Sequence, residues 1–136
     1  MYLIATRSFP PELGGMQSLM WGLTKEMSKN FMIKVFADYQ ENHKEFDKEV
    51  NFSIERIGGI KFLRKIRKAQ LINEFLRENK VQGIIADHWK SLELIKTTNK
   101  KYCLIHGKEI NHPKGSFQNK KIVKVLNNVE KVIANS

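Results

Sequence analysis

Short apolar runs alternate along this chain with longer segments in which apolar residues recur every three or four positions. Continuous apolar runs between turn residues are typical of buried strands, and the longer spacing is typical of helices packed by one face. The pattern predicts strands at residues 1–6, 32–37, 52–57, 83–86, 102–106 and 131–134, and helices at 16–29, 61–79, 91–98 and 117–128. The polar residues 39–50 are expected to form a loop.

The order of these elements is a repeated alternation of strand and helix. Such alternation with nearly continuous apolar strands predicts an α/β fold, a Rossmann-like parallel sheet with helices on both faces. At 136 residues the chain is expected to form one domain, long enough to bury roughly 65–70% of its unfolded surface. The methionines of the first helix, Met16, Met20 and Met27, are expected to face the core.

Cysteine content and hydropathy indicate a cellular setting. The one cysteine, Cys103, lies inside the apolar run 102–105, so it has no internal disulfide partner and is expected to be a buried small hydrophobe. A reducing compartment fits best. No signal peptide precedes Arg7, and no apolar run approaches the roughly 18 residues of a membrane span. We therefore expect a soluble, cytoplasmic protein.

The net charge of +10 points to an anionic partner. Its densest cluster lies in the predicted helix at 61–79, where basic residues alternate with an apolar stripe. The basic residues are Lys61, Arg64, Lys65, Arg67 and Lys68, and the stripe is Phe62, Ile66, Ala69, Ile72 and Leu76. This helix could dock on an anionic membrane surface, at about 1 kcal/mol per basic residue, or it could be an ordinary solvated face. Nucleic acid is disfavoured, because no recognised module is present and aromatic residues do not interleave with the basic run beyond Phe62.

Chemically capable residues follow three of the predicted strands. In open parallel sheets, ligands bind outside the carboxyl ends of the strands. The loop after the first strand spans residues 7–17, and the later loops hold Asp87, His88, Trp89, Lys90, His106, Lys108 and Glu109. Each has an unremarkable alternative, such as packing for Trp89 or a surface role for His88. His106 is the strongest candidate, because it stands at a strand end beside a glycine.

The first of these loops contains the segment FPPELGGMQS, residues 9–18, placed between a strand and a helix. A glycine pair allows the backbone to approach a ligand closely, and the first N–H groups of a helix form a ready anion site. The spacing is neither a dinucleotide fingerprint nor a Walker loop. Gly14 and Gly15 are therefore candidates for phosphate binding, although such a turn is also an ordinary loop.

The segment 9–18, followed by LIHGKE at 104–109 and by VIANS at 132–136, resembles the N-terminal half of a glycosyltransferase family 4 enzyme of the GT-B fold. The resemblance covers nearly the whole chain and depends on the order of the motifs. It implies a retaining transfer of a sugar from a nucleotide-diphosphate sugar to a glycan or lipid-linked acceptor, with no further cofactor and no required metal. The segment 14–18 is also similar to the corresponding loop of bacterial phosphatidylinositol mannosyltransferases.

The resemblance also implies roles for individual residues. His106 would contact the transferred sugar as the catalytic residue, and Gly14 and Gly15 would approach the donor diphosphate, whose developing charge backbone N–H groups would stabilise. Gln17 would face the acceptor. The other residues placed near the acceptor are Asp87, His88, Trp89, Lys90, Lys108 and Glu109. The basic helix would dock the protein peripherally at the inner face of a membrane that carries the acceptor.

Enzymes of this family need a second domain that holds the nucleotide, and the 136 residues do not extend into it. The resemblance therefore implies a donor domain in cis or in trans, and little or no turnover by the chain alone. A second hypothesis is a non-catalytic module that binds an anionic lipid or a phosphorylated ligand through the same basic helix and glycine turn.

Overall fold

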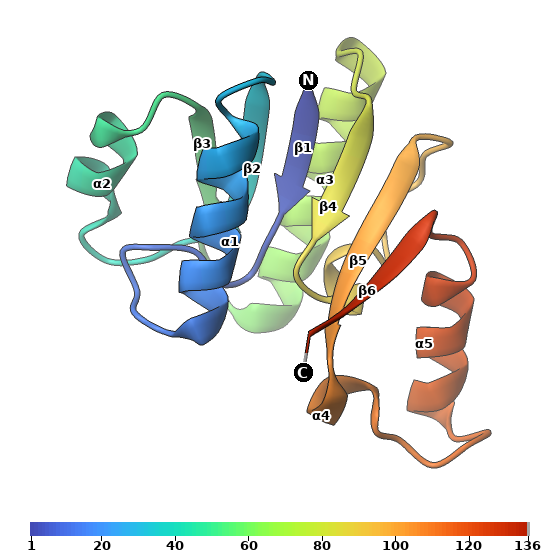
Figure 1. The fold of residues 1–136 in the computed structure, drawn as a ribbon. Coiled ribbons are helices and arrows are strands. Elements are labelled where there is room, and N and C mark those ends of the chain that lie inside the picture. The colour runs from blue at the N-terminus through green and yellow to red at the C-terminus, as the bar shows by residue number, and fades with distance from the viewer. Residues whose placement is uncertain (136) are drawn as a thin grey trace.

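A computed structural model describes residues 1–135 as a six-stranded, all-parallel sheet covered by helices (Figure 1). The strands are β1 (Tyr2–Ala5), β2 (Ile33–Asp38), β3 (Ser53–Ile57), β4 (Gly83–Ala86), β5 (Lys100–His106) and β6 (Lys131–Asn135). Their order across the sheet is β3-β2-β1-β4-β5-β6. This confirms the predicted α/β, Rossmann-like fold.

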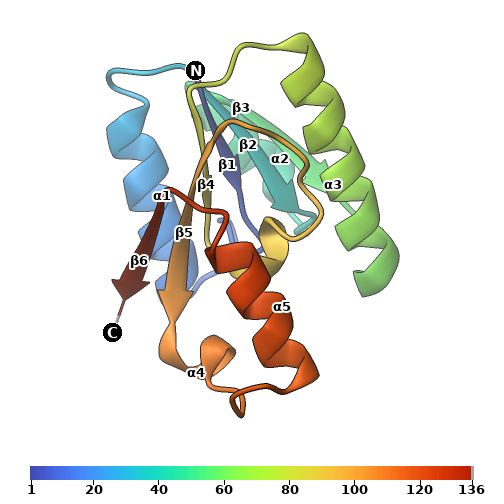
Figure 2. The ribbon, with the colours of Figure 1, turned by 90° about the vertical axis from the view of Figure 1, so that its right-hand side faces the viewer.

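The helices are α1 (Gly15–Met27), α2 (His43–Glu49), α3 (Lys61–Glu78), the 3₁₀ helix η1 (Trp89–Ser91), α4 (Gly107–Ile110) and α5 (Phe117–Leu126). Viewed along the sheet, α1 lies on one side and α3 and α5 on the other (Figure 2). Two apolar cores result. Met20, which is fully buried, centres the core under α1, with Met16 and Met27 packed beside it. Ile72 centres the core under α3. The methionine stripe is therefore core, as predicted.

The strand order reverses between β1 and β4. Strands β2 and β3 lie on one side of β1, whereas β4, β5 and β6 lie on its other side. Such a reversal of strand order opens a crevice at the carboxyl ends of the two central strands. Strand β5 extends past that edge. Cys103 pairs with Ala86, the last residue of β4, so three further residues carry β5 about 10 Å beyond β4 before it ends at His106. The carboxyl edge is therefore stepped, with His106 on its projecting part.

The predicted loop at 39–50 is wrong, because α2 occupies His43–Glu49. The helix follows Asn42, which adopts the left-handed conformation with φ 60°. Its one aromatic residue, Phe46, packs against Trp21 of α1 at 5.1 Å between ring centroids. Seven residues with a single apolar anchor give too weak a periodicity to be recognised in sequence. Tertiary packing rather than amphipathic pattern therefore stabilises α2.

The predicted helix at 91–98 is also wrong. Only η1 is helical here, and the chain then turns, with Leu92 and Ile95 buried. The side chain of Asn73 of α3 bonds to the backbone of this segment. Its Nδ2 donates to the Leu94 carbonyl at 3.1 Å, and its Oδ1 accepts from the Lys96 N–H at 2.9 Å. These side-chain bonds replace the intrahelical ones. The four-residue helix α4 was not predicted either.

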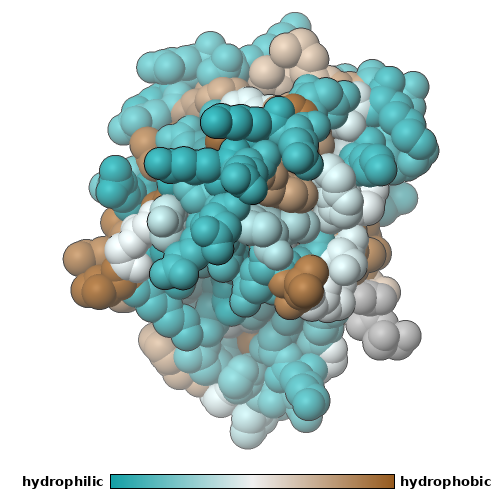
Figure 3. All heavy atoms as spheres, turned by 90° about the vertical axis from the view of Figure 1, so that its left-hand side faces the viewer, coloured by the Kyte–Doolittle hydropathy of each residue, from teal (hydrophilic) through white to brown (hydrophobic). Residues whose placement is uncertain are grey.

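The predicted apolar stripe of α3 is wrong at its first position, since Phe62 is 71% exposed, whereas Ala69 and Ile72 are buried as expected. At the β3 edge of the sheet, Glu55 and Arg56 place charge on the strand. The face of the molecule that includes α2 is mainly hydrophilic, with hydrophobic residues scattered over it (Figure 3). Charged edge strands resist pairing with other chains. The β6 edge differs, because Val132 and Ile133 are 41% and 46% exposed.

Candidate functional site

Asp87 organises the carboxyl edge of the sheet. It directly follows β4 and is 2% exposed. One carboxylate oxygen, Oδ2, accepts hydrogen bonds from the Thr6 hydroxyl at 2.7 Å, the Arg7 N–H at 2.9 Å and the Ser8 N–H at 3.2 Å. The other, Oδ1, accepts from the Ser91 hydroxyl at 3.2 Å. All four donors surround a side chain that has almost no contact with solvent. Asp87 therefore ties the loop after β1 to η1 and acts as a positioning residue, and its burial leaves little of the carboxylate accessible for the predicted acceptor contact.

The loop that leads to the glycine pair is fixed at its start. Phe9 is 1% exposed and lies edge-on to Trp21, Phe46 and Phe52, at 6.2 to 6.4 Å between ring centroids. Arg56 places its guanidinium 5.7 Å from the Phe9 ring and donates to the Pro10 carbonyl at 2.5 Å. The Pro10–Pro11 peptide is cis. The path from β1 to α1 is thus held by aromatic packing and one cation.

At the glycine pair, Gly14 is extended, with φ 163° and ψ 166°, and Gly15 is the first residue of α1. A Cβ on Gly15 would meet no atom within 4 Å, whereas one on Gly14 would come within 2.2 Å of the Gln17 amide oxygen. Gln17 Nε2 in turn donates to Glu12 at 3.0 Å, and Glu12 also accepts from Gln40 at 2.9 Å. A side chain at Gly15 would therefore enter open space at the start of α1, and Gln17 is engaged with Glu12.

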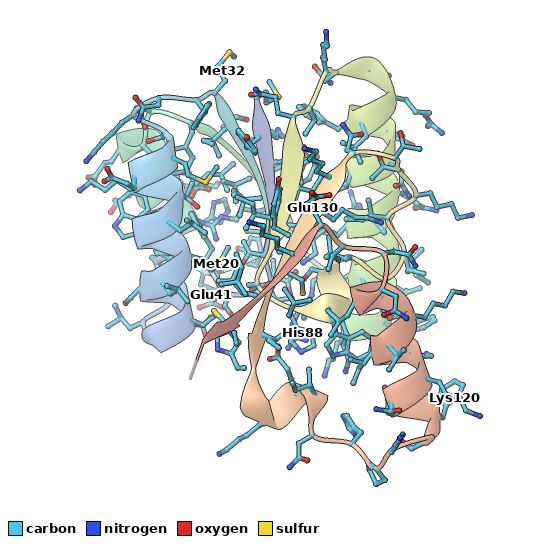
Figure 4. All side chains as sticks on the ribbon, turned by 45° about the vertical axis from the view of Figure 1, so that its right-hand side comes forward. Met20, Met32, Glu41, His88, Lys120 and Glu130 are labelled. Carbon is cyan, nitrogen blue, oxygen red and sulfur yellow. The ribbon has the colours of Figure 1, made fainter. Side chains whose placement is uncertain are left out.

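His88 lies at the carboxyl end of the sheet, remote from Met32 at the opposite end (Figure 4). Its Nδ1 accepts from the Lys90 N–H at 3.0 Å, and its Nε2 lies 3.7 Å from a Glu109 carboxylate oxygen. Burial, with the positive charges of Arg7 and Lys90, lowers the pKa of His88 to about 3. The ring is therefore neutral near pH 7. Because Nδ1 accepts a hydrogen bond, Nε2 carries the proton and points toward Glu109.

Trp89 is 1% exposed and belongs to the core beneath α3. The structure therefore favours the packing role over the predicted contact with the acceptor. Its ring lies against His88, with centroids 5.7 Å apart, and the Lys90 ammonium lies 5.5 Å from its centroid. The indole N–H is buried and has no hydrogen-bond partner within residues 1–135. Trp89 therefore supports the His88 ring and the Lys90 side chain from inside the protein.

At the end of β5, the His106 N–H donates to Glu109 Oε1 at 3.1 Å, which closes α4 back on the strand. Burial raises the pKa of the Glu109 carboxyl. The Nε2 atom of His106 is buried and has no hydrogen-bond partner among the described residues. Buried polar atoms are normally paired, so this nitrogen has spare hydrogen-bonding capacity at the projecting edge. Lys108 is exposed.

A pocket of about 260 Å³ is enclosed by four elements: the end of β1, the end of β2, the first turns of α3, and η1. It is lined by Arg7, Ser8, Asp38, Tyr39, Gln40, Lys61, Arg64, Lys65, Lys68, Lys90 and Ser91. Six of these residues are basic and one is acidic. The sequence interpretation named five of the eleven as site or patch residues, Lys61, Arg64, Lys65, Lys68 and Lys90. Arg7, Ser8 and Ser91 lie in loops that it singled out without giving them a role. It missed Asp38, Tyr39 and Gln40, because residue type alone does not reveal which strand ends become neighbours.

The predicted basic patch on α3 is not a uniform surface. Lys68 is 5% exposed and donates to Asp38 at 2.6 Å and to the Thr6 carbonyl at 2.9 Å. Arg64 lies 3.1 Å from the other Asp38 oxygen, and Lys65 pairs with Glu93. Arg67 is exposed and lies outside the pocket. Four of the five basic residues thus face the pocket, and Lys68 forms part of its floor.

Within residues 1–135, no three His, Cys, Asp or Glu side chains lie close enough together to hold a metal ion. Over the same range, no helix has both the length and the apolar character needed to cross a membrane. Cys103 is fully buried in the core, as predicted, and this burial raises the pKa of its thiol to about 12. Ser136, the last residue of the segment 132–136, lies outside the described residues.

The fold and the carboxyl-edge site define a Rossmann-like α/β protein whose polar loops meet at the crevice beside β1 and β4. No family model matches the chain, and no curated protein matches it.

Proposed function

We propose that this chain is the acceptor-binding half of a retaining glycosyltransferase, similar to the N-terminal half of a family 4 enzyme. One observation carries the proposal. The glycine loop, the His88 turn and His106, which are widely separated in sequence, come from β1, β4 and β5 at one edge of the sheet, and Asp87 joins the first two directly. That edge is where parallel α/β sheets bind ligands.

In this proposal the N–H end of α1 at Gly15 faces the diphosphate of the donor. Preorganised backbone dipoles stabilise negative charge as the sugar–phosphate bond breaks, without having to reorganise during the reaction. The unpaired Nε2 of His106 makes a hydrogen bond to the sugar being transferred. Neutral His88, with its Nε2 proton toward Glu109, lines the neighbouring part of the crevice.

A second Rossmann-like domain, on the same or another polypeptide, would hold the nucleotide. The exposed apolar residues Val132 and Ile133 of edge strand β6 support such a contact, because apolar edge strands are ordinarily covered by another segment or chain. The exposed basic residues of α3, Lys61 and Arg67, support an acceptor carried at an anionic membrane, with the protein bound peripherally.

The test is to read the coding DNA beyond and beside this gene segment, to produce the protein together with any α/β donor domain found there, and to supply radiolabelled nucleotide-diphosphate sugars with membrane extract. Labelled glycan or glycolipid that forms with the pair, and falls when His106→Ala is introduced, would support the proposal. A donor domain that binds nucleotide sugar in the complex but transfers nothing, or transfer that ignores His106→Ala, would overturn it.

A further inference from the structure

The pocket between β1, β2, α3 and η1 contains more positive charge than the protein neutralises. Asp38 pairs with both Lys68 and Arg64, and Glu93 pairs with Lys65. Arg7, Lys61 and Lys90 make no ion pair with any carboxylate in the described part of the chain. Three unpaired cations thus converge on one hollow.

These cations are close enough to affect one another. Burial, with the positive charges of Arg7 and Lys61, lowers the pKa of Lys90. Such mutual repulsion destabilises the empty pocket, and a bound anion would relieve it. The Trp89 ring lies behind the Lys90 ammonium, and Asp38 holds Lys68 and Arg64 in the lining of the same pocket. Ordered side chains therefore position part of the basic lining, and Arg7 and Lys61 add their charges beside it.

We propose that this pocket is a phosphate subsite, which holds a phosphoryl or pyrophosphoryl group of a larger ligand. Several unpaired cations suit a multiply charged group better than a single carboxylate, and an arginine beside lysines is a common phosphate-binding set. Ser8 and Tyr39 add hydroxyl groups to the lining. The volume of about 260 Å³ lies just under the roughly 300–1,000 Å³ of sites that enclose a whole small molecule.

The subsite adds a ligand-binding role to the proposed function. Phosphate binding does not depend on that function, and only the identification of the ligand as the sugar acceptor rests on it. It lies toward β2, whereas His88 and His106 lie toward β5. An acceptor anchored there by its phosphate would extend across the crevice toward the reacting sugar. The phosphate itself could be carried by a lipid or by a soluble molecule, and the chemistry of recognition is the same.

The first experiment is calorimetric titration of the protein with inorganic pyrophosphate. We expect saturable binding, and Arg7→Gln, Lys61→Gln and Lys90→Gln should each weaken it by about fivefold, which is the effect of one cation near an anionic surface. The side chains of these residues make no hydrogen bond in the described structure. The backbone N–H of residue 7, which donates a hydrogen bond to Asp87, is retained in Arg7→Gln. Circular dichroism should therefore show unchanged folding.

Arg67→Gln is the matched control, because Arg67 is an exposed basic residue of the same helix outside the pocket. It should leave pyrophosphate affinity unchanged. Absence of saturable binding, or an equal loss in Arg67→Gln and Lys61→Gln, would overturn the subsite. Because no donor is present, this result is independent of sugar transfer. If an assembled pair transfers sugar but this chain does not bind pyrophosphate, the subsite is overturned and the proposed function stands.

Sedimentation with phosphatidylcholine vesicles that contain phosphatidic acid identifies the source of the phosphate. Vesicle binding that pyrophosphate displaces, and that Lys61→Gln weakens more than Arg67→Gln, would support the subsite with a lipid as the carrier. Pyrophosphate binding without vesicle binding would support it with a soluble carrier. Vesicle binding that depends equally on Arg67 and Lys61 and is not displaced would overturn the subsite in favour of the outer surface of α3.

Discussion

The Thr6 hydroxyl donates a 2.7 Å hydrogen bond to the Asp87 carboxylate, and this contact joins residues 81 positions apart at the ends of β1 and β4. Thr6 is fully buried, and its Oγ1 also accepts from the Ser8 N–H at 3.1 Å. The pair therefore fixes the first residues of the loop that leads to both the glycine turn and the basic pocket. The geometry of the candidate site therefore depends on a buried hydrogen bond between the ends of two strands.

Asp87→Ala should lower the free energy of unfolding by about 3 kcal/mol, because two backbone N–H groups and two hydroxyls lose a charged acceptor in a buried place. Thr6→Val should cost about 1–2 kcal/mol, since one charged hydrogen bond is lost while the shape is kept. Urea denaturation followed by circular dichroism measures both. Thr98→Val, at an exposed position, is the control and should change stability little. Equal stabilities of all four proteins would contradict the role given to Asp87.

Lys68→Met should destabilise the protein by about 3 kcal/mol, because it leaves the Asp38 carboxylate half-buried with Arg64 as its only ion-pair partner. The double variant Lys68→Met with Asp38→Asn should be less destabilised than the sum of the two single changes, since it removes both charges of the buried pair and leaves only the more exposed Arg64 without its carboxylate. Urea unfolding of the four proteins in the cycle measures the coupling. Additive effects would show that the two residues do not act as a buried pair.

His88 should make stability fall as the solution becomes acidic. Its folded pKa of about 3 lies below its ordinary value of 6.5. Protonation therefore favours the unfolded chain, and the contribution of the neutral ring, complete above pH 6.5, is lost progressively toward pH 3. At pH 5 the loss should reach about 2 kcal/mol. Urea denaturation between pH 7.5 and pH 5 measures it.

His88→Gln should remove this part of the pH dependence, because glutamine does not titrate. His112→Gln, a change at an exposed histidine, should leave the dependence as in the wild type. Glu109 acts in the opposite sense. Its raised pKa adds stability at low pH that is lost as the pH rises through the folded value. The two residues must therefore be separated by comparing variants, and a wild-type profile in His88→Gln would contradict the prediction.

Gly15→Val should abolish sugar transfer by an assembled enzyme while leaving the fold intact. The new Cβ meets no protein atom within 4 Å, so its branched side chain would occupy the space assigned to the donor diphosphate. Gly22→Val, at an equally open position of α1, is the matched control and should retain activity. The measurement is kcat/KM for transfer, with circular dichroism to check folding. Equal activity of both variants would remove the glycine loop from the mechanism.

His106→Ala should lower kcat/KM for transfer by about 10- to 100-fold, as expected for one lost hydrogen bond to a reacting group. Because His106 Nε2 has no partner in the described structure, the substitution breaks no hydrogen bond of that nitrogen. Stability should therefore change less than activity. A loss of stability that accounts for the whole loss of activity would show that His106 has a structural role only.

Local pattern predicted the strands well. The run at 83–86 is β4 with the same bounds, and the ends of β1 and β3 differ from the prediction by one residue. β1 and β4 are almost entirely apolar, so their burial is evident from residue type, whereas β3 carries Glu55 and Arg56 and is recognised by its apolar positions Ile54 and Ile57. The prediction failed for α2 and for residues 91–98, where Phe46 packing against Trp21 and Asn73 bonding to the chain after η1 decide the conformation. Such contacts come from distant segments and leave no local periodicity.

The carboxyl-edge rule predicted the location of the candidate site, and the roles of its residues were implied by the resemblance alone. The carboxyl-edge rule identified the loops that contain Asp87, Trp89 and His106, because topology alone places strand ends together. It did not distinguish the buried positioning carboxylate of Asp87, or the buried Trp89 ring, from residues with free polar atoms. Burial and hydrogen bonding depend on which neighbours surround a side chain.

The sequence by itself determined the order of strands and helices, the parallel sheet and the edge at which its polar loops gather, because these follow from hydrophobic periodicity along a continuous segment. Only the tertiary structure decided that Lys68 is buried against Asp38 and that Asp87 bonds to Thr6. It also decided that Arg7, Lys61 and Lys90 share one pocket with no ion pair to a carboxylate of the described chain. The physical reason is that charge and hydrogen-bond pairing act between atoms in contact, and contacts across 30 to 80 residues exist only once the strands have taken their places in the sheet.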